Sequence, residues 1–394
     1  MESFFQRHAY LLEHTDLSMT RPLMNDIDWK YRLIGIKGPR GVGKTTFLLQ
    51  YAKKNYSYSV GRCLYVNMNS FYFRGRGLVD FAQEFVRRGG RVLIVDQLFK
   101  QSGWRDELCE CYHNLPLLQI IFATTTVEDP GTENDELSRL ARFYVLHGFS
   151  FREYINMQAG FDIPRVSLED ILDNTEDVQK SILMKVRPWI FLQSYLHHGY
   201  YPFYIEKRNF TENLLKSINA MIEVDVLFTK QIDVKYVSRL KKLLYLLVLN
   251  GSESPNVSNL AKEINTSRAT VMNYINNLEE ARLIHQIYKQ HSVGPKKPAR
   301  VLTHNTNLLY AILSGAPSDQ EIMETFFTNS IWRHHKVETT RKSNVYLIDG
   351  EKQICVCDKT TKKRLKDAGT YFARYNTEVA HDGDIPLWLF GFLY

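Results

Sequence analysis

Short apolar runs alternate with amphipathic helical stretches along the first 155 residues of the chain. The runs predicted as buried strands are residues 32–36, 63–68, 92–96, 119–125 and 143–146. Between the second and third of these, residues 78–88 repeat apolar side chains at helical spacing, and Gly89 and Gly90 end that helix. Alternating strands and helices predict an α/β fold, with a mostly parallel sheet covered by helices on both faces.

The glycine-rich stretch after the first strand fits the pattern G-x-x-x-x-G-K-[ST]. Glycines let backbone N–H groups turn inward around phosphate oxygens, and the helix that follows adds its dipole. In such a loop, Lys44 neutralises the β- and γ-phosphates and Thr45 gives its hydroxyl to Mg²⁺. The predicted ATP-binding residues are Gly38, Pro39, Arg40, Gly41, Val42, Gly43, Lys44, Thr45 and Thr46.

Polar residues that end the later strands complete the predicted catalytic set. Asp96 closes the run 92–96 at the carboxyl edge of the sheet, where ligands bind in open α/β sheets, and is a predicted metal ligand together with Thr45. Thr124 or Thr125 ends the next strand and faces the γ-phosphate, unless both are turn residues. Arg142, or Arg139 before it, is a candidate to reach a phosphate in its own or a neighbouring subunit, with a solvated surface arginine as the alternative.

Helical patterns continue through residues 156–235, and residues 236–312 then change character. A short apolar-faced helix, a turn at Asn265 and a second helix precede two runs, 283–288 and 300–303, that can pair around a basic tip. This order predicts a winged helix-turn-helix. Such modules bind DNA or serve as protein-interaction arms. The predicted DNA contacts are Arg268, Tyr274, Lys296 and Lys297.

The last segment, residues 313–394, alternates short helices and strands. Residues 345–348 and 353–357 are predicted to form a hairpin closed by Asp349 and Gly350. The apolar residues 385–394 are predicted to form a buried strand.

Composition sets the broad class of protein. The 394 residues are 44% hydrophobic and 24% charged, with a formal charge of +7, which permits nucleic-acid contact without demanding it. No apolar run approaches a membrane span and residues 1–8 lack the apolar core of a signal peptide, so we expect a cytoplasmic protein. Five cysteines, with C-x-C pairs at 109/111 and 355/357, favour reduced thiols; a zinc site would need both pairs to meet.

Seven stretches carry a resemblance over nearly the whole chain: GPRGVGKTT, RRGGRVLIVDQLFKQSGW, GFSFREY, GYYPFY, SRATVMNYINNLEEARLI, ETFF and IPLWLFGFLY. In these, the chain resembles the bacterial and archaeal AAA-type ATPases with a C-terminal domain of restriction-nuclease-like fold and unknown function, in the form common among Bacteroidetes. The resemblance implies a P-loop AAA-type ATPase domain (1–155), a helical lid (156–235), the winged helix (236–312) and a small α+β nuclease-like domain (313–394).

Two departures from that family change the expected activity. The family usually has Asp-Glu where this chain has Asp96 and Gln97; glutamine can orient water but cannot accept its proton. The strand expected to carry nuclease acids and a lysine instead holds Cys355 and Cys357, and Glu324 lacks carboxylate partners, so this domain is expected to be structural or partner-binding. The sequence predicts a slow ATPase or ATP-gated switch; the alternative is a DNA-binding regulator in which ATP is mainly structural.

Overall fold

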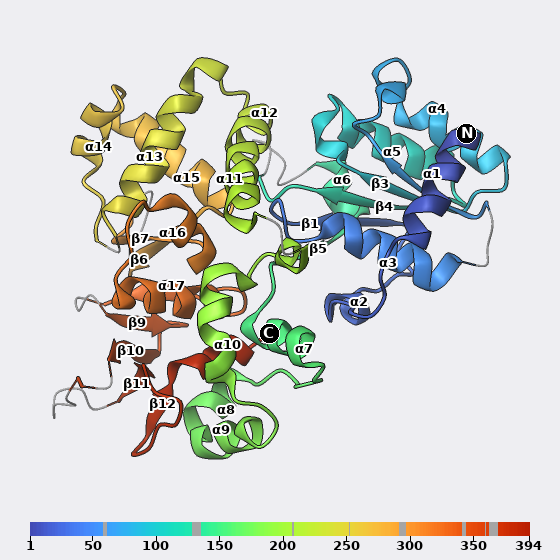
Figure 1. Cartoon of the computed structure of the whole chain (residues 1–394). Helices are drawn as coiled ribbons and strands as arrows, with labels where there is room; N and C mark the ends of the chain where they lie inside the picture. Colours follow the sequence, from blue (N-terminus) through green and yellow to red (C-terminus); the bar gives the residue numbers. More distant parts are fainter. Residues whose placement is uncertain are drawn as a thin grey trace. The chain divides into compact units, whose positions relative to one another are not determined.

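The computed structural model describes residues 1–57, 61–127, 135–206, 209–251, 253–290, 297–340, 344–358, 360–361 and 369–394. The chain divides into two compact units. The first comprises Met1–His147 and Glu223–Ile232, and the second comprises Gly148–Ile222 and Asp233–Tyr394. Figure 1 shows the whole chain coloured along its sequence.

The first unit is an alternation of strands and helices. Its elements are α1 (Glu2–Glu13), α2 (Leu23–Asp26), β1 (Leu33–Lys37), α3 (Lys44–Tyr56), β2 (Cys63–Asn67), α4 (Leu78–Arg87), β3 (Val92–Asp96), α5 (Trp104–Asn114), β4 (Gln119–Thr124), α6 (Glu136–Leu140), β5 (Arg142–Val145) and, from the later segment, α12 (Leu227–Thr229). Short 3-10 turns lie at Phe71–Arg74 and Leu98–Lys100.

The five strands of this unit form one parallel sheet in the order β2-β3-β4-β1-β5. Helices α4 and α5 lie on one face of the sheet and α3 on the other (Figure 1). The buried apolar strand residues, such as Leu93 and Phe122, pack with Phe81 and Leu108 of those helices. The predicted α/β fold of a P-loop nucleoside triphosphatase is therefore confirmed. Because all strands run the same way, their carboxyl ends meet at one edge.

The segment Glu223–Ile232 belongs to the first unit although 75 residues, 148–222, separate it from the rest of that unit. It contains the end of a π-helix (Met221–Val226) and the short α12. The family resemblance implies a helical lid at 156–235, which includes these residues. The contacts of the chain assign them instead to the unit that holds the phosphate loop.

The second unit begins with helices and ends with a sheet. Its helices are α7 (Phe151–Ala159), α8 (Leu168–Asp173), α9 (Thr175–Leu183), α10 (Pro188–Ser194), α11 (Phe210–Ala220), α13 (Val237–Leu249), α14 (Val257–Glu263), α15 (Arg268–Glu280), α16 (Thr306–Ile312) and α17 (Asp319–Ile331). Its strands are β6 (Ile284–Lys289), β7 (Arg300–Thr303), β8 (Val337–Thr339), β9 (Val345–Ile348), β10 (Lys352–Asp358), β11 (Thr370–Tyr375) and β12 (Asp384–Pro386).

Those strands form a single seven-stranded sheet in the order β12-β11-β10-β9-β8-β6-β7. The expected pairing of β6 with β7 is present and antiparallel, and β9 and β10 form the expected hairpin. In addition, β6 pairs with β8, which the sequence did not suggest. The β6–β7 hairpin is thereby continuous with the sheet of the last segment, so residues 236–312 and 313–394 share one sheet.

One expectation for the last segment needs correction. The apolar residues at the end of the chain are buried, but Leu387–Phe392 form a 3-10 helix where a strand was expected. Glu324, for which no carboxylate partner is expected, has partners of another kind: its carboxylate forms a buried ion pair with Arg300 and accepts a hydrogen bond from Gln320. A buried carboxylate needs such partners, because an unpaired charge in the interior is strongly unfavourable. Within the described residues, no helix is long and apolar enough to cross a membrane.

Candidate nucleotide site

The phosphate loop connects β1 to α3 at the carboxyl edge of the sheet. Gly41 and Gly43 have φ values of 82° and 89°, in the left-handed region that glycine adopts without steric penalty. Helix α3 begins at Lys44, so its first N–H groups, with their partial positive charge, face the loop. The backbone therefore has the geometry in which successive N–H groups can surround an anion.

The side chain of Lys44 lies within the loop itself. Its Nζ donates hydrogen bonds to the carbonyl oxygens of Gly38 (2.6 Å) and Pro39 (2.9 Å). Burial lowers the pKa of Lys44 to about 8, and the carboxylates of Asp225 and Asp96 oppose that shift. Desolvation disfavours the ammonium, so an added anion would find a cation whose charge is poorly compensated by solvent.

Asp96 ends β3 at the same edge and is held by hydroxyl donors. Its Oδ2 accepts hydrogen bonds from the Thr45 hydroxyl (2.6 Å) and from the Tyr65 hydroxyl (2.8 Å). Only 1% of Asp96 is exposed. A hydroxyl and a carboxylate in contact, beside a phosphate loop, form the oxygen donor set that Mg²⁺ prefers, so the residues present fit this ion.

Sequence reasoning missed Tyr65. It stands in the middle of β2, the strand that pairs with β3, and nothing in its apolar surroundings distinguishes it from a core residue. Only the register of β2 against β3 shows that the Tyr65 hydroxyl reaches Asp96. Burial and the neighbouring Asp96 carboxylate raise the pKa of Tyr65, so it stays protonated and donates to Asp96.

Gln97 directly follows Asp96 and has an unusual backbone. Its φ is 61°, in the left-handed region that favours glycine, and its N–H donates to Asp96 Oδ1 at 2.8 Å. Its side-chain Oε1 is buried, and no hydrogen-bond partner for it lies within the described residues. A left-handed non-glycine residue with an unsatisfied amide oxygen is uncommon, and such features cluster at functional sites.

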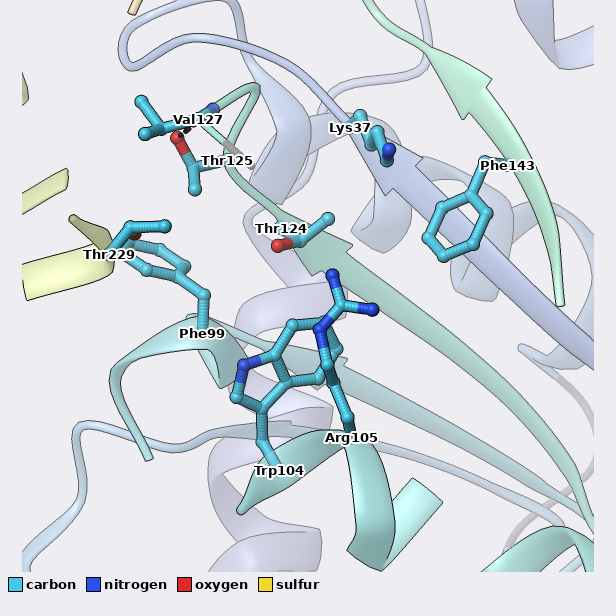
Figure 2. A pocket seen from close by; sticks show the side chains of 9 residues that line it. All are labelled: Lys37, Phe99, Trp104, Arg105, Thr124, Thr125, Val127, Phe143 and Thr229. Atoms are coloured by element: carbon cyan, nitrogen blue, oxygen red, sulfur yellow. Dashed lines mark hydrogen bonds between the residues drawn. The ribbon is translucent and has the colours of Figure 1, made fainter. Parts of the chain in front are cut away.

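Thr124, at the end of β4, lines a small cavity with a volume of about 20 Å³. Figure 2 shows the side chains around it: Lys37, Phe99, Trp104, Arg105, Thr124, Thr125, Val127, Phe143 and Thr229. The volume suits about one water-sized group. Thr124 and Thr125 are both buried. The polar tip of β4 thus lies at the carboxyl edge of the sheet and lines a space that polar and aromatic side chains share.

Arg142 lies at the wrong edge to serve the phosphate loop of its own chain. It begins β5 and pairs with Ile34, whereas the loop starts after Lys37 at the far end of β1. At ~3.3 Å per residue, four residues place it roughly 13 Å from the start of the loop. Its guanidinium stacks on the Tyr31 ring, with the Cζ atom 4.8 Å from the ring centre. The expectation of a role within its own subunit is therefore wrong, because parallel pairing puts the start of β5 at the opposite edge.

Arg40, the third residue of the loop, pairs with a carboxylate that sequence reasoning did not single out. Its Nε donates to Asp225 Oδ1 (3.0 Å) and Oδ2 (2.9 Å), and its terminal nitrogen Nη2 donates to Oδ1 (2.7 Å). Asp225 is 2% exposed. The two residues are 185 positions apart, so no local pattern relates them.

The candidate DNA-binding residues separate into three groups. Arg268 and Lys297 are exposed. Tyr274 is only 6% exposed and belongs to the inward face of α15 with Val271 and Ile275, so its predicted outward position is wrong. Helical spacing places Tyr274 one residue from Ile275, on the flank of the buried stripe. Lys296 lies outside the described residues.

A zinc site would require the two C-x-C pairs to meet in space. The five cysteines are free and buried. Within the described ranges, no group of three or more histidine, cysteine, aspartate or glutamate side chains could hold a metal ion.

Comparison with known proteins agrees with the phosphate loop. Residues 30–155 match the family model of an AAA domain, and residues 191–313 match a domain of unknown function (DUF8612). Together with the sheet order and loop geometry, the first match supports an AAA-type, nucleotide-binding domain over residues 30–155. The chain is 27% identical over 280 residues to an uncharacterized protein of Methanocaldococcus jannaschii, covering 68% of this chain and 59% of that protein's length.

Solved structures show weaker likeness. AMPPCP-bound DnaA from Aquifex aeolicus aligns with a TM-score of 0.28 and 17% identity, over 65% of this chain and 84% of that chain. C. elegans PCH-2 aligns with a TM-score of 0.24 and 15% identity, over 71% and 66% of the two chains. Likeness at these TM-scores is not evidence for the fold. The strand order, the phosphate loop and the family match show the fold without it.

Proposed function

We propose that this chain binds ATP with Mg²⁺ at the phosphate loop and hydrolyses it slowly, as an ATP-gated switch. The observation that carries the proposal is the contact between the Thr45 hydroxyl and the Asp96 carboxylate, at 2.6 Å, beside a loop with two left-handed glycines. Thr45 lies in the first turn of α3 and Asp96 ends β3, so two separate elements bring these groups to the same sheet edge. A purely structural turn does not require a buried carboxylate at that point.

Each residue of the site has a defined task in this proposal. Thr45 and Asp96 would hold Mg²⁺, which when bound neutralises charge on the phosphates. Lys44 binds the β- and γ-phosphates as a fixed positive charge, and the loop N–H groups orient them. Thr124, at the end of β4, would donate a hydrogen bond from its hydroxyl to the γ-phosphate. Gln97 orients water through its amide, and because it cannot accept a proton, turnover is slow.

Equilibrium binding and turnover test the proposal separately. Titration with ATP by calorimetry, with and without Mg²⁺, should show one site that weakens when Mg²⁺ is removed. Phosphate release under saturating ATP should then be measurable but slow. Absence of ATP binding by the folded protein contradicts the whole proposal, whereas binding without any turnover contradicts only its catalytic part.

A second candidate function is DNA binding by residues 236–312, with ATP mainly structural. The exposed side chains of Arg268, at the first turn of α15, and Lys297, before β7, favour it. The order α14, turn, α15, β6 and β7 supports the interpretation as a winged helix-turn-helix. For residues 313–394 we propose a structural or partner-binding role on a nuclease-like framework, because Glu324 is engaged by Arg300.

A further inference from the structure

Arg40 of the phosphate loop forms an ion pair with Asp225. Both oxygens of Asp225 accept from Arg40, and the geometry is the two-pronged one that makes such pairs strong. Asp225 is almost fully buried, while the side chain of Arg40 is 22% exposed. This contact therefore holds the Arg40 guanidinium against a carboxylate of the same chain.

Arg40 is not the only cation near Asp225. Burial raises the pKa of Asp225, and the charges of Arg40, Lys44 and Lys100 act against that shift. Lys44 is the same residue that a phosphate loop directs at nucleotide phosphates. One internal carboxylate thus stands within electrostatic range of the positive charges on which a polyphosphate would depend.

The segment that carries Asp225 also lies next to the end of β4. Thr229, four residues later, lines the cavity beside Thr124 (Figure 2). The segment Glu223–Ile232 packs with the first unit, but the chain that precedes and follows it belongs to the second unit. It is therefore joined to the second unit at both ends, at residues 222 and 233.

We infer that Asp225 and the phosphates of ATP compete for Arg40 and Lys44, so that ATP binding releases Glu223–Ile232 from the phosphate loop. This inference rests on the proposed binding of ATP and supplies the step by which the switch would work. The chemistry that drives release is the like charge of a buried carboxylate and a polyphosphate: the two anions repel, and both need the same cations.

Competition has a direct consequence for affinity. In a competitive arrangement, part of the binding free energy of ATP is used to break the Arg40–Asp225 pair. Replacing Asp225 by asparagine keeps the side-chain shape but removes the competing charge. ATP should then bind more tightly, by about 5-fold or more, which is the lower range of typical coupling between linked events.

The experiment compares ATP affinity in three proteins by calorimetry: the unaltered chain, Asp225→Asn and Asp80→Asn. Asp80 is exposed on α4 and provides the same charge change away from the loop. We expect tighter binding for Asp225→Asn alone. Equal or weaker binding than in the unaltered chain, with Asp80→Asn unchanged, overturns the inference and leaves ATP binding itself intact.

Hydrogen exchange on the unaltered chain provides a test that needs no variant. Amides of residues 223–232 should exchange faster with the non-hydrolysable analogue AMPPCP and Mg²⁺ than without nucleotide, by about 5-fold. In Asp225→Asn, exchange should be fast in both conditions. Bound nucleotide with unchanged or slower exchange in this segment overturns the inference, whereas failure of the unaltered chain to bind any nucleotide overturns the proposed function as well.

Discussion

The hydroxyl of Thr45 donates a 2.6 Å hydrogen bond to Oδ2 of Asp96. Thr45 follows β1 through the phosphate loop, and Asp96 ends β3, with β4 between these two strands. The loop therefore reaches across the end of β4 to bring a hydroxyl and a carboxylate together. This places the two predicted metal ligands in contact, as one Mg²⁺ ion would require.

Lys44→Ala is expected to abolish measurable ATP binding while leaving the fold intact. Removal of one partner from a desolvated charge pair typically weakens binding by about 2–5 kcal/mol. Calorimetric titration measures the loss, and circular dichroism checks the fold. Lys54→Ala is the matched control, since Lys54 is exposed on the same helix, α3, and should bind ATP normally. Unchanged ATP affinity in folded Lys44→Ala would contradict the site assignment.

ATP affinity is expected to fall as the pH rises through the pKa of Lys44, which burial lowers to about 8. Below this pH, Lys44 carries the positive charge that binds phosphate; above it, the neutral amine of Lys44 must take up a proton for binding. Each pH unit above the pKa should weaken binding up to about tenfold, until the pKa of the bound form is reached.

Calorimetry in two buffers of different ionisation enthalpy checks this, because binding should take up a proton above pH 8 and none well below it. Lys54→Ala should show the same pH profile as the unaltered chain. A flat affinity between pH 7 and 9 would mean that Lys44 is fully charged throughout.

Tyr65→Phe is expected to lower the affinity of the ATP complex for Mg²⁺ by about tenfold. Loss of a partner that orients a metal ligand typically has an effect of this order. The variant removes only the hydroxyl that donates to Asp96 at 2.8 Å. Titration of Mg²⁺ at fixed ATP measures the change. Tyr51→Phe, on a buried tyrosine of α3, controls for loss of a hydroxyl elsewhere in the unit. Identical Mg²⁺ curves for all three proteins would remove Tyr65 from the site.

The sequence predicted the parts of the site that depend on local patterns. The phosphate loop, Lys44 and Asp96 each follow from a strand and a short motif, and parallel order brings them to one edge. Asp225 could not be found in this way, since its contact with Arg40 spans 185 positions. The sequence did not predict the position of Arg142 correctly. Arg142 begins β5, and the first residue of a parallel strand lies at the edge of the sheet opposite the phosphate loop.

The predictions for the second unit failed for a different reason. Tyr274 was assigned outward because a tyrosine on the flank of an apolar stripe is compatible with either face, and only packing decides. The β6–β8 pairing joins residues 236–312 to the last segment, and pairing between separate motifs leaves no mark in hydrophobic periodicity.

Duplex DNA binding, where it occurs, is expected to be weak and to depend on Arg268 and Lys297. Alanine at either position should reduce binding across sequences and lower the salt slope by about 1, as expected for loss of one phosphate contact. Fluorescence anisotropy from low to moderate salt measures both. Tyr274→Phe should have no effect, because the side chain is buried. No binding to any duplex at low salt would leave this module as a protein-interaction arm.

Gln97→Glu is expected to raise the rate of ATP hydrolysis above that of the unaltered chain by at least about tenfold, because a general base typically contributes about 10²–10⁴-fold. Gln97 follows Asp96 at the carboxyl edge, and its N–H bonds to Asp96 Oδ1, so residue 97 is fixed beside the proposed metal ligand. Phosphoryl transfer has a loose transition state in which positioning of water matters more than proton removal. The unaltered chain should therefore be slow, not inactive.

Steady-state phosphate release from both proteins, at saturating ATP, measures the difference, and ATP affinity should be nearly equal. Gln97→Ala is the informative companion: it removes the amide that orients water and should be slower than the unaltered chain. Another acid of the chain, Glu128, lies outside the described residues, and Glu128→Gln tests whether it serves as the general base in place of residue 97. If the unaltered chain already hydrolyses ATP as fast as Gln97→Glu, then Gln97 does not limit the chemistry, and slow turnover can no longer support the interpretation as a switch.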